Sequence, residues 1–377
     1  MRIALIIGLA PQKKGSLEDW LAGIAREASS RSHQLDIFGL EPILPDFQTT
    51  LEGYGATWNR VVDLSDEPLR AIRRLRGYDV VHLNFFGVGS RIALLCFAAW
   101  PTPIVYVDHF SKRELRMSPA ARLRRSVLTR IARSRIAVAI GVSDFIRKHV
   151  VSLLGLSSDR AVTIYNGIDL DRFAFEPTIR DRDGTLRVLA VANLIPEKGV
   201  DRLVEAASRL DSVHLRVIGE GPERKHLEEL ASSLGIAGRT DFLGLRSDVE
   251  QHLADCDVFV HPATWTEAFG LTVAEAMAGA QPVVASRIGA LPELIEHGRS
   301  GLLVPPGDES ALAAALQQLL ESPSLRRDLG ANAQRRARDL FDLDRCVGRH
   351  VDLCEVAANH GDPGVAAPKP GENEADR

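Results

Sequence analysis

The chain has 377 residues, of which 45% are hydrophobic and 25% are charged, and its formal net charge is −4. These values are ordinary for a soluble globular protein of about two domains, and no run approaches the roughly 18 apolar residues of a membrane span. The four cysteines have neither metal-ligand spacing nor the pattern of a disulfide framework, so we expect a reducing, cytoplasmic compartment.

Short apolar runs alternate with helical patterns in the first half of the chain. The first run is followed by Gly and polar residues, which suit a strand-to-helix loop better than a signal-peptide cleavage site. Buried β-branched runs between helices are typical of a parallel sheet that is covered on both faces. We expect strands at residues 2–7, 34–38, 80–84, 104–107, 136–140 and 161–164, and helices at residues 16–30, 88–99, 119–132 and 143–153.

A polar stretch with Gly and Pro, residues 169–185, interrupts this alternation and indicates a linker between domains. The same alternation then resumes. Strands are expected at residues 186–191, 213–218, 240–242, 258–261, 282–285 and 301–303, and late helices at residues 311–320, 325–340 and 344–357. The sequence thus predicts an α/β protein with parallel-sheet domains at residues 1–170 and 171–342. A helix at residues 343–358, which crosses back to the first domain, and a disordered tail at residues 359–377 follow.

Charge is distributed unevenly along the chain. Residues 1–180 hold 25 Lys and Arg against 18 Asp and Glu, a net charge of +7, whereas residues 181–377 hold 21 against 32, a net charge of −11. Much of the basic excess lies between Lys112 and Arg135, where nine basic residues face one acidic residue, a net charge of +8. From Pro119 onward the apolar residues have nearly helical spacing, which predicts a basic amphipathic helix.

This helix has two interpretations. In the first, Arg122, Arg124 and Arg125 face an anionic membrane surface, and the acceptor is brought to the protein there. In the second, it is an ordinary surface helix whose apolar stripe packs on the sheet while its arginines are solvated. The sequence leaves both open.

The strongest chemical signal is the segment 267–275, EAFGLTVAE, which follows the buried strand that ends at His261. A glycine, Gly270, directly precedes a predicted helix, whose first free N–H groups, around residues 271–273, form an anion site suited to a diphosphate. Glu267 stands before this turn and Glu275 about one helical turn after it. Because a carboxylate is an acceptor-only group, Glu267 is expected to hold the transferred sugar and Glu275 the ribose. The alternative is that both are solvent-exposed surface residues.

This segment resembles the E-x7-E motif of the family 4 retaining glycosyltransferases, which have the GT-B fold. The resemblance extends over roughly residues 140–320, and more loosely over the N-terminal half. It rests on the ordered set of segments ANLIPEKG at 192–199, RVIGEGPE at 216–223, FLG at 242–244, PVVAS at 282–286 and GLLVPPGD at 301–308.

The resemblance implies roles for further residues. Lys198 is expected to meet the donor diphosphate, where its charge offsets the charge of the leaving group; as an alternative it is a surface lysine. His109, at a strand end, is expected near the transferred sugar, and Gly15 near the donor phosphates. A structural histidine and a plain turn glycine are the alternatives. The full set of expected donor-binding residues is Gly15, Asn193, Lys198, Gly221, Leu243, Phe269, Gly270, Leu271, Thr272 and Glu275.

One departure from the family pattern concerns the lysine loop. Many relatives have an arginine where this chain has Asn193, so Lys198 becomes the main cationic contact from that loop. The first N-terminal loop also lacks the usual Gly-Gly pair and has Pro11–Gly15 instead. The first departure leaves open how the donor phosphates are held.

By this resemblance the fold is GT-B, with two Rossmann-like domains that face each other across a cleft. The implied activity is retaining, metal-independent, front-face transfer of a sugar from a nucleotide-diphosphate sugar. Glu267, Lys198 and His109 act in catalysis, and no cofactor is needed. The acceptor is a glycan, a lipid-linked or cell-envelope molecule or a small molecule, and no nucleic acid is involved. A nucleotide-sugar epimerase or hydrolase of the same fold and a non-catalytic nucleotide-sugar-binding subunit are the alternatives. The expected location is cytoplasmic and peripheral on the inner face of the membrane.

Overall fold

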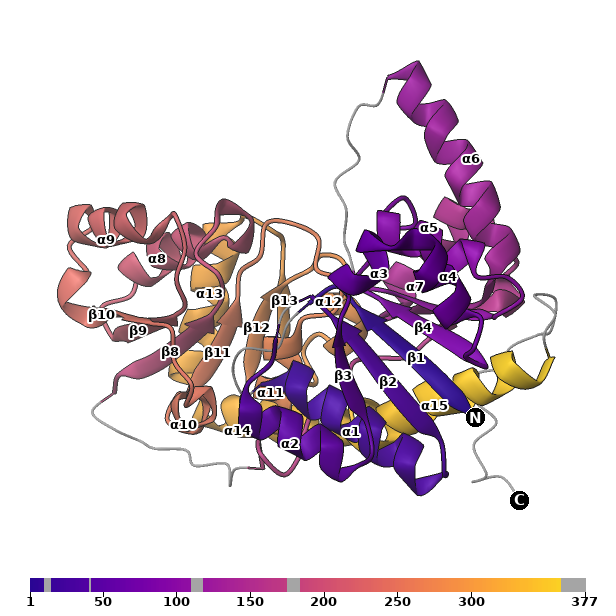
Figure 1. Cartoon of the computed structure of the whole chain (residues 1–377). Coiled ribbons are helices and arrows are strands. Elements are labelled where there is room, and N and C mark those ends of the chain that lie inside the picture. The colour runs from indigo at the N-terminus through magenta and orange to yellow at the C-terminus, as the bar shows by residue number, and fades with distance from the viewer. Residues whose placement is uncertain (10–14, 41, 110–117, 175–183, 361–377) are drawn as a thin grey trace. The chain divides into compact units, whose positions relative to one another are not determined.

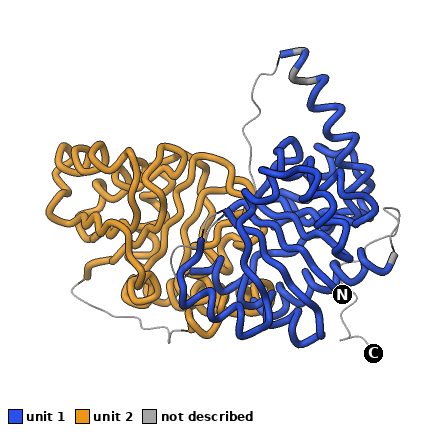
Figure 2. The backbone as a smooth tube through the Cα atoms, in the orientation of Figure 1, with its two compact units in different colours: residues 1–167, 343–377 blue, residues 168–342 orange. Residues whose placement is uncertain are grey.

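The computed structural model describes residues 1–9, 15–40, 42–109, 118–174 and 184–360. Contacts divide the chain into two compact units (Figure 2). Unit 1 comprises Met1–Gly167 and Leu343–Arg377, and unit 2 comprises Ile168–Asp342. Each unit contains one parallel sheet, which confirms the predicted α/β class. The predicted tail lies outside the described residues from residue 361 onward.

Unit 1 is built on a sheet of seven parallel strands in the order β3-β2-β1-β4-β5-β6-β7. The order reverses between β1 and β4, so their carboxyl ends form the edge where open α/β sheets bind ligands. The strands are β1 (Arg2–Ile7), β2 (Gln34–Gly39), β3 (Thr57–Arg60), β4 (Val80–Asn84), β5 (Ile104–Asp108), β6 (Ile136–Gly141) and β7 (Ala161–Thr163).

Helices cover both faces of this sheet (Figure 1). On one side α15 packs on α1 and over the central strands, and α4, α5 and α7 lie on the other side. The central strands are buried along their whole length because both faces are covered, which explains their apolar composition. The helices are α1 (Ser16–Ser30), α2 (Pro45–Gly53), α3 (Val62–Asp66), α4 (Pro68–Leu75), α5 (Arg91–Ala98), α6 (Pro119–Arg135), α7 (Asp144–Leu154), the 3-10 turn η1 (Ser158–Arg160) and α15 (Leu343–His360).

Unit 2 has a sheet of six parallel strands in the order β10-β9-β8-β11-β12-β13, so its order reverses between β8 and β11. Its strands are β8 (Leu186–Val191), β9 (Val213–Ile218), β10 (Thr240–Gly244), β11 (Val258–His261), β12 (Val283–Ser286) and β13 (Leu302–Val304). Its helices are η2 (Pro196–Lys198), α8 (Val200–Ser208), α9 (Arg224–Ser233), η3 (Ala237–Arg239), α10 (Val249–Ala254), α11 (Leu271–Ala278), α12 (Leu291–Leu294), α13 (Glu309–Glu321) and α14 (Pro323–Leu340).

All twelve strands that the sequence predicts are present, with ends that differ by at most two residues. The structure also contains β3 and the helices α2, α3 and α4, which were not predicted. β3 has the sequence TWNR at the edge of the sheet and lacks an apolar run, so its hydrophobic pattern gave no signal. None of the described helices is long and apolar enough to span a bilayer.

Candidate functional site

The reversal of strand order in unit 2 brings two loops together. Lys198 ends η2 in the loop after β8, and Glu267 lies in the loop after β11. The Lys198 ammonium forms an ion pair with Glu267 Oε1, which also lies 3.1 Å from His261 Nε2. His261 is the last residue of β11 and is buried. The structure therefore brings together two of the three residues expected to act in catalysis.

Backbone contacts hold these two loops against each other. The N–H groups of Thr264 and Trp265 donate to the carbonyl of Glu197 over 3.0 and 3.2 Å. Gly199 has a φ of +63°, and a Cβ at this position would lie 2.2 Å from the Pro262 carbonyl oxygen. Glycine is therefore required for η2 to approach the β11 loop closely enough for the ion pair.

The Glu267 carboxylate is held in its charged form. Burial alone would raise its pKa, but the hydrogen bond and charge of His261 and the charge of Lys198 oppose this and lower the pKa to about 2. The side chain is 15% exposed, so one flank remains accessible. A charged carboxylate that is partly accessible accepts hydrogen bonds from hydroxyl groups.

A second glycine fixes the backbone around Glu267. Gly289 has a φ of +57°, and a Cβ there would lie 2.3 Å from the Glu267 carbonyl oxygen and 2.7 Å from its nitrogen. The N–H of Ala290 donates to the same carbonyl over 3.0 Å. The loop after β12 therefore supports Glu267 from behind.

The start of α11 has the geometry expected of an anion site. Gly270 precedes the helix with a φ of +102°, and a Cβ would lie 2.8 Å from Leu291. The Val273 N–H donates to the Gly270 carbonyl over 3.0 Å. Of the three amides expected to bind an anion, those of Leu271 and Thr272 therefore remain, and both residues are at least partly exposed.

The other expected donor-binding residues of unit 2 follow the same sheet edge. Phe269 is only 3% exposed and packs edge-on against Phe341, so its contribution to binding would come from its backbone. Glu275 is partly exposed one turn into α11. Asn193 is exposed in the loop that also holds Lys198.

Gly221 lies in the loop that follows β9, and Leu243 lies near the end of β10. A Cβ on Gly221 would lie 2.3 Å from the Leu194 carbonyl oxygen, so the loop after β9 packs directly on the loop after β8. The Gly219 N–H donates to the carbonyl of Gly244, next to Leu243, over 2.9 Å. These contacts bring the loops after β8, β9 and β10 together along one edge of the sheet.

Unit 1 contains the remaining two expected residues. His109 follows β5 and its ring stacks on Phe85, with ring centroids 3.7 Å apart and an interplanar angle of 11°. Phe85 follows β4 with a φ of +59°, which is uncommon for a residue other than glycine and is concentrated at functional sites. A Cβ on Gly8, after β1, would lie 2.6 Å from the Phe85 carbonyl oxygen. The ends of β1, β4 and β5 therefore meet around His109.

Gly15 precedes α1 with an extended φ of −176°, a conformation open to any residue. A Cβ there would meet only the Glu18 carboxylate, at 3.7 Å. Its role at the donor phosphates therefore rests on the resemblance alone. The neighbouring residues 10–14 lie outside the described part of the chain.

Sequence reasoning missed three residues that shape these sites: His261, Gly289 and Phe85. The sequence carried a signal for His261, a polar residue at the end of an otherwise apolar strand. Gly289 and Phe85 are recognisable only from backbone angles. Among the residues that the structure describes, no group of three His, Cys, Asp or Glu side chains is arranged to hold a metal ion.

Comparison with known proteins places both units in one family. A family model described as glycosyl transferases group 1 matches residues 172–336, and one described as glycosyltransferase family 4 matches residues 18–172. The chain is 32% identical to the MMP alpha-(1->4)-mannosyltransferase of Mycolicibacterium hassiacum, over 77% of this chain and 74% of the relative. It is 29% identical to the GDP-mannose-dependent alpha-(1-6)-phosphatidylinositol monomannoside mannosyltransferase of Mycolicibacterium smegmatis, over 87% of this chain and 92% of the relative.

Solved structures agree on the fold. HepE of Anabaena in complex with UDP matches with a TM-score of 0.79 at 24% identity, covering 94% of this chain and 100% of that one. WaaG, a glycosyltransferase involved in lipopolysaccharide biosynthesis, matches with a TM-score of 0.70 at 19% identity, covering 94% of this chain and 99% of that one. Together with the family matches and the mannosyltransferase relative, they establish that the chain belongs to the family 4 glycosyltransferases, retaining hexosyltransferases of the GT-B fold that use nucleotide sugars.

Proposed function

We propose that this chain transfers a hexose from a nucleotide-diphosphate sugar to a lipid-linked or cell-envelope acceptor by front-face transfer without a metal ion. The observation that carries the proposal is the Glu267 carboxylate, held charged between Lys198 and His261 near the start of α11. In this scheme the diphosphate sits at the amides of Leu271 and Thr272.

The two partners of the ion pair have different roles in this scheme. When the diphosphate binds, Lys198 exchanges its contact with Glu267 for one with the phosphate oxygens. Glu267 is then released to accept hydrogen bonds from hydroxyls of the sugar. Lys198 offsets the negative charge that develops on the leaving diphosphate as the glycosidic bond breaks. The departing phosphate oxygen takes the proton of the attacking hydroxyl on the same face, so configuration is retained.

Glu275 completes the donor site as an acceptor for the ribose hydroxyls, and the base lies at the loop that holds Gly221 and at the end of β10 near Leu243. His109 of unit 1 contacts the transferred sugar, and unit 1 binds the acceptor. Both relatives are mannosyltransferases and the one from Mycolicibacterium smegmatis is GDP-mannose-dependent, which favours GDP-mannose as the first donor to test.

The test is product analysis with purified protein, GDP-mannose or UDP-glucose, and polyprenyl phosphate or phosphatidylinositol acceptors. We expect an α-linked glycolipid and free nucleoside diphosphate, and their loss in Glu267→Gln but not in Glu321→Gln, an exposed glutamate of α13. Release of free sugar without a glycolipid would favour a hydrolase, and an altered nucleotide sugar an epimerase. Binding without any turnover would favour a non-catalytic subunit.

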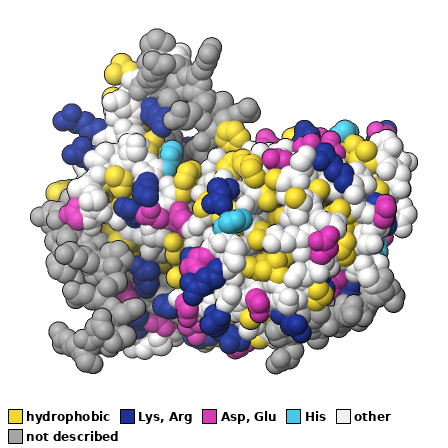
Figure 3. Space-filling model, turned by 180° about the vertical axis from the view of Figure 1, so that it is seen from behind, with side chains coloured by type: hydrophobic (Ala, Val, Ile, Leu, Met, Phe, Trp, Pro, Cys, Tyr) yellow, Lys and Arg dark blue, Asp and Glu magenta, His cyan; other side chains and the backbone are white. Residues whose placement is uncertain are grey.

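For the acceptor we further infer docking of unit 1 on an anionic membrane surface. In α6, Leu123, Val127 and Ile131 recur every four residues along one side of the helix and are 69%, 52% and 40% exposed. Arg124 and Arg130 are exposed as well. Figure 3 shows basic side chains next to hydrophobic ones on the part of unit 1 that holds this helix.

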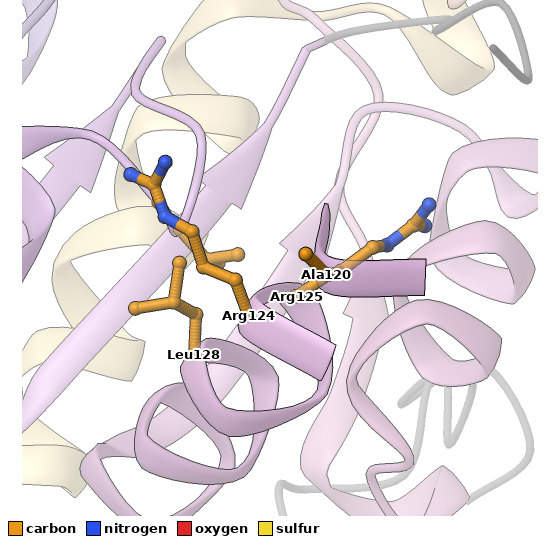
Figure 4. A pocket seen from close by; sticks show the side chains of 6 residues that line it. Ala120, Arg124, Arg125 and Leu128 are labelled. Atoms are coloured by element: carbon orange, nitrogen blue, oxygen red, sulfur yellow. The ribbon is translucent and has the colours of Figure 1, made fainter. Parts of the chain in front are cut away.

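Two hollows border α6 and both contain arginines. The first has an apolar floor and is lined by Val88, Gly89, Ala120, Arg124, Arg125 and Leu128. Arg124 and Arg125 extend away from each other on either side of the helix (Figure 4). The second is polar and is lined by Ser126, Thr129, Arg130, Arg133, Ser134, Leu154 and Arg160. An apolar stripe between arginines suits the boundary between lipid headgroups and acyl chains. Lys112–Arg116 and the Arg122 side chain lie outside the described residues.

Each basic residue near an anionic leaflet contributes on the order of 1 kcal/mol. We therefore expect binding to vesicles that contain phosphatidylglycerol at low salt, with a decline as salt rises. The triple variant Arg124→Ser, Arg125→Ser and Arg130→Ser should lose binding in cosedimentation. A matched control removes three other exposed arginines of unit 1, Arg70, Arg73 and Arg76. Wild-type protein that stays in the supernatant at low salt would exclude docking and favour a soluble acceptor.

A further inference from the structure

A continuous line of polar side chains crosses the interior of unit 1 from His109 to α15. His109 Nε2 lies 3.4 Å from Asn84 Oδ1, Asn84 Nδ2 lies 2.6 Å from His82 Nδ1, and His82 Nε2 lies 3.0 Å from His350 Nδ1. His82 and Asn84 point from β4, and His350 belongs to the helix that covers this strand. We call these four residues the histidine chain.

The inner members of the histidine chain are almost completely enclosed. Asn84 is 0%, His82 is 1% and His350 is 4% exposed, and Trp20 closes the far end with its ring centroid 5.5 Å from that of His350 in a T-shaped contact. Only His109 is partly exposed. Unpaired polar groups at such positions would be costly, so an apolar core would be the simpler solution for packing alone. The histidine chain opens toward the sheet edge at one end only.

The orientation of the Asn84 amide and the proton positions of the three histidines depend on one another, so fixing one of them fixes the others. In the orientation that the structure has, Asn84 Oδ1 accepts, so His109 must carry its proton on Nε2. Its Nδ2 donates, so His82 must be unprotonated at Nδ1 and must carry its proton on Nε2. That proton is then donated to His350 Nδ1. If the amide rotated by 180°, each of these three hydrogen bonds would reverse and the His109 proton would move to Nδ1.

We propose that Asn84, His82 and His350 are positioning residues that hold His109 as the neutral tautomer with its proton on Nε2, so that Nδ1 accepts a hydrogen bond from a hydroxyl of the transferred sugar. This inference rests on the proposed sugar contact of His109. The tautomer is thus set from α15, three hydrogen bonds away from His109.

Two observations support a neutral, fixed ring. Phe85 stacks on His109 and fixes the plane of the imidazole while leaving the tautomer to its hydrogen bond. Burial lowers the pKa of His82 to about 3, and burial together with the neighbouring His82 lowers the pKa of His109 to about 3. Burial and the neighbouring His82, His109 and Arg349 hold the pKa of His350 well below its usual value. An alternating line of donors and acceptors requires that all three histidine rings are neutral.

The sharpest test compares two changes at His350. Gln at this position retains an oxygen that can accept from His82 Nε2. Leu removes the acceptor and so allows the hydrogen bonds of the histidine chain to reverse their direction. The control is His33→Gln, which alters a different contact of α15, the 2.7 Å hydrogen bond of His33 with Glu355. The readouts are the ring-nitrogen NMR shifts of His109, which report the tautomer without any turnover, and kcat and KM for transfer. Circular dichroism verifies that each variant folds.

We expect a single Nε2–H tautomer of His109 in the wild type, His350→Gln and His33→Gln, and its loss in His350→Leu. Turnover should fall in His350→Leu by about 3- to 10-fold, the factor of one neutral hydrogen bond, with KM for the donor nearly unchanged. Asn84→Leu should have the same effect. If His350→Leu is folded and His109 keeps its Nε2 proton, the proposed chain is overturned.

If the proposed contact between His109 and the sugar is wrong, the variants should give a different set of results. If His109→Ala transfers sugar at the wild-type rate, the role of His109 itself is wrong, whatever its tautomer. If turnover falls in His109→Ala but not in Asn84→Leu and His350→Leu, His109 keeps its role and only the positioning role of the other three residues is wrong.

Discussion

At the scale of single residues, the ion pair between Lys198 and Glu267 joins two groups that lie 69 positions apart in the sequence. The family resemblance names both, but it assigns them to different parts of the donor. Their contact means that neither group is free to change alone. Removing Lys198 leaves a partly buried carboxylate with only His261 beside it, and removing Glu267 leaves an ammonium without its counter-charge.

The two glutamates of the α11 loop should differ in their kinetic effect. Glu275→Ala removes a charged acceptor of the ribose and should weaken binding of the free nucleotide by about 1.5–3 kcal/mol in calorimetry. Glu267→Ala should instead lower kcat, along with kcat/KM, because its partner is the transferred sugar. Unchanged nucleotide affinity in Glu275→Ala would remove that residue from the site, and wild-type turnover in Glu267→Ala would do the same for Glu267.

Lys198 and His109 should both act mainly in the transition state, when sugar and phosphate separate. We expect Lys198→Met and His109→Ala to lower kcat and kcat/KM together in steady-state kinetics. An effect on KM alone would reassign the residue to binding of the ground state.

At the scale of elements, the site depends on loops that approach more closely than side chains allow. Gly199 allows η2 to pack against the loop after β11, and Gly289 allows the loop after β12 to pack against Glu267. Both glycines have positive φ, and a Cβ added to either would lie within 2.3 Å of a backbone oxygen. The position of the ion pair is therefore set by the backbone before any ligand binds.

Gly199→Ala should damage the site beyond its cost in backbone strain. The new Cβ would push η2 away from the Pro262 carbonyl and separate Lys198 from Glu267, so we expect kcat/KM to fall at least about tenfold. Gly235→Ala is the matched control, because Gly235 has a similar φ of +71° but no atom within 4 Å of its Cβ position. The left-handed conformation should cost each variant about 1–2 kcal/mol of stability, and Gly199→Ala should lose more because its Cβ also displaces the Pro262 carbonyl; denaturant unfolding measures both losses. Equal activity in the two would contradict the role assigned to Gly199.

The sequence was informative where hydrophobic patterns are long and fully buried. The strands β4 and β8 are buried along nearly their whole length, so their apolar runs identified them. By contrast β3 and the short helices between residues 45 and 75 have mixed polarity, and two of those helices begin at Pro45 and Pro68. The link between His82 and His350 spans 268 positions and leaves no local pattern, so only a structure reveals it.

At the scale of the whole molecule, acid should weaken the two units in different pH ranges. The pKa of buried His82 is about 3, below the value of 6.5 for an exposed histidine. Below pH 6.5 the unfolded chain therefore binds a proton that the folded unit 1 excludes. The stability that neutral His82 provides is complete above pH 6.5 and is lost progressively as the pH falls toward 3. Glu267 in unit 2 has a pKa lowered from 4.5 to about 2, so its contribution to stability is lost only as the pH falls below 4.5.

Between pH 6.5 and 4.5, hydrogen exchange in the β4 and β5 amides should therefore accelerate more than that in β8 and β11, after correction for intrinsic rates. Each fully excluded proton corresponds to about 1.4 kcal/mol per pH unit. The variant His350→Gln lacks one of the buried histidines, so hydrogen exchange in its unit 1 should depend less steeply on pH. An equal loss of protection in both units over this range would contradict the prediction.

The discontinuity of unit 1 in the sequence has a consequence for biosynthesis. The helix α15, which covers β4 and supplies the partner of His82, begins only after the last residue of unit 2. At roughly 5–20 residues per second, a ribosome needs about 13 to 54 seconds to advance the 268 positions from residue 82 to residue 350. During that interval the last three strands of unit 1 and all of unit 2 are translated, and the face of the nascent sheet that α15 will cover stays uncovered. Unit 2 can thus fold to completion first, and the nascent N-terminal sheet is a natural client for chaperones.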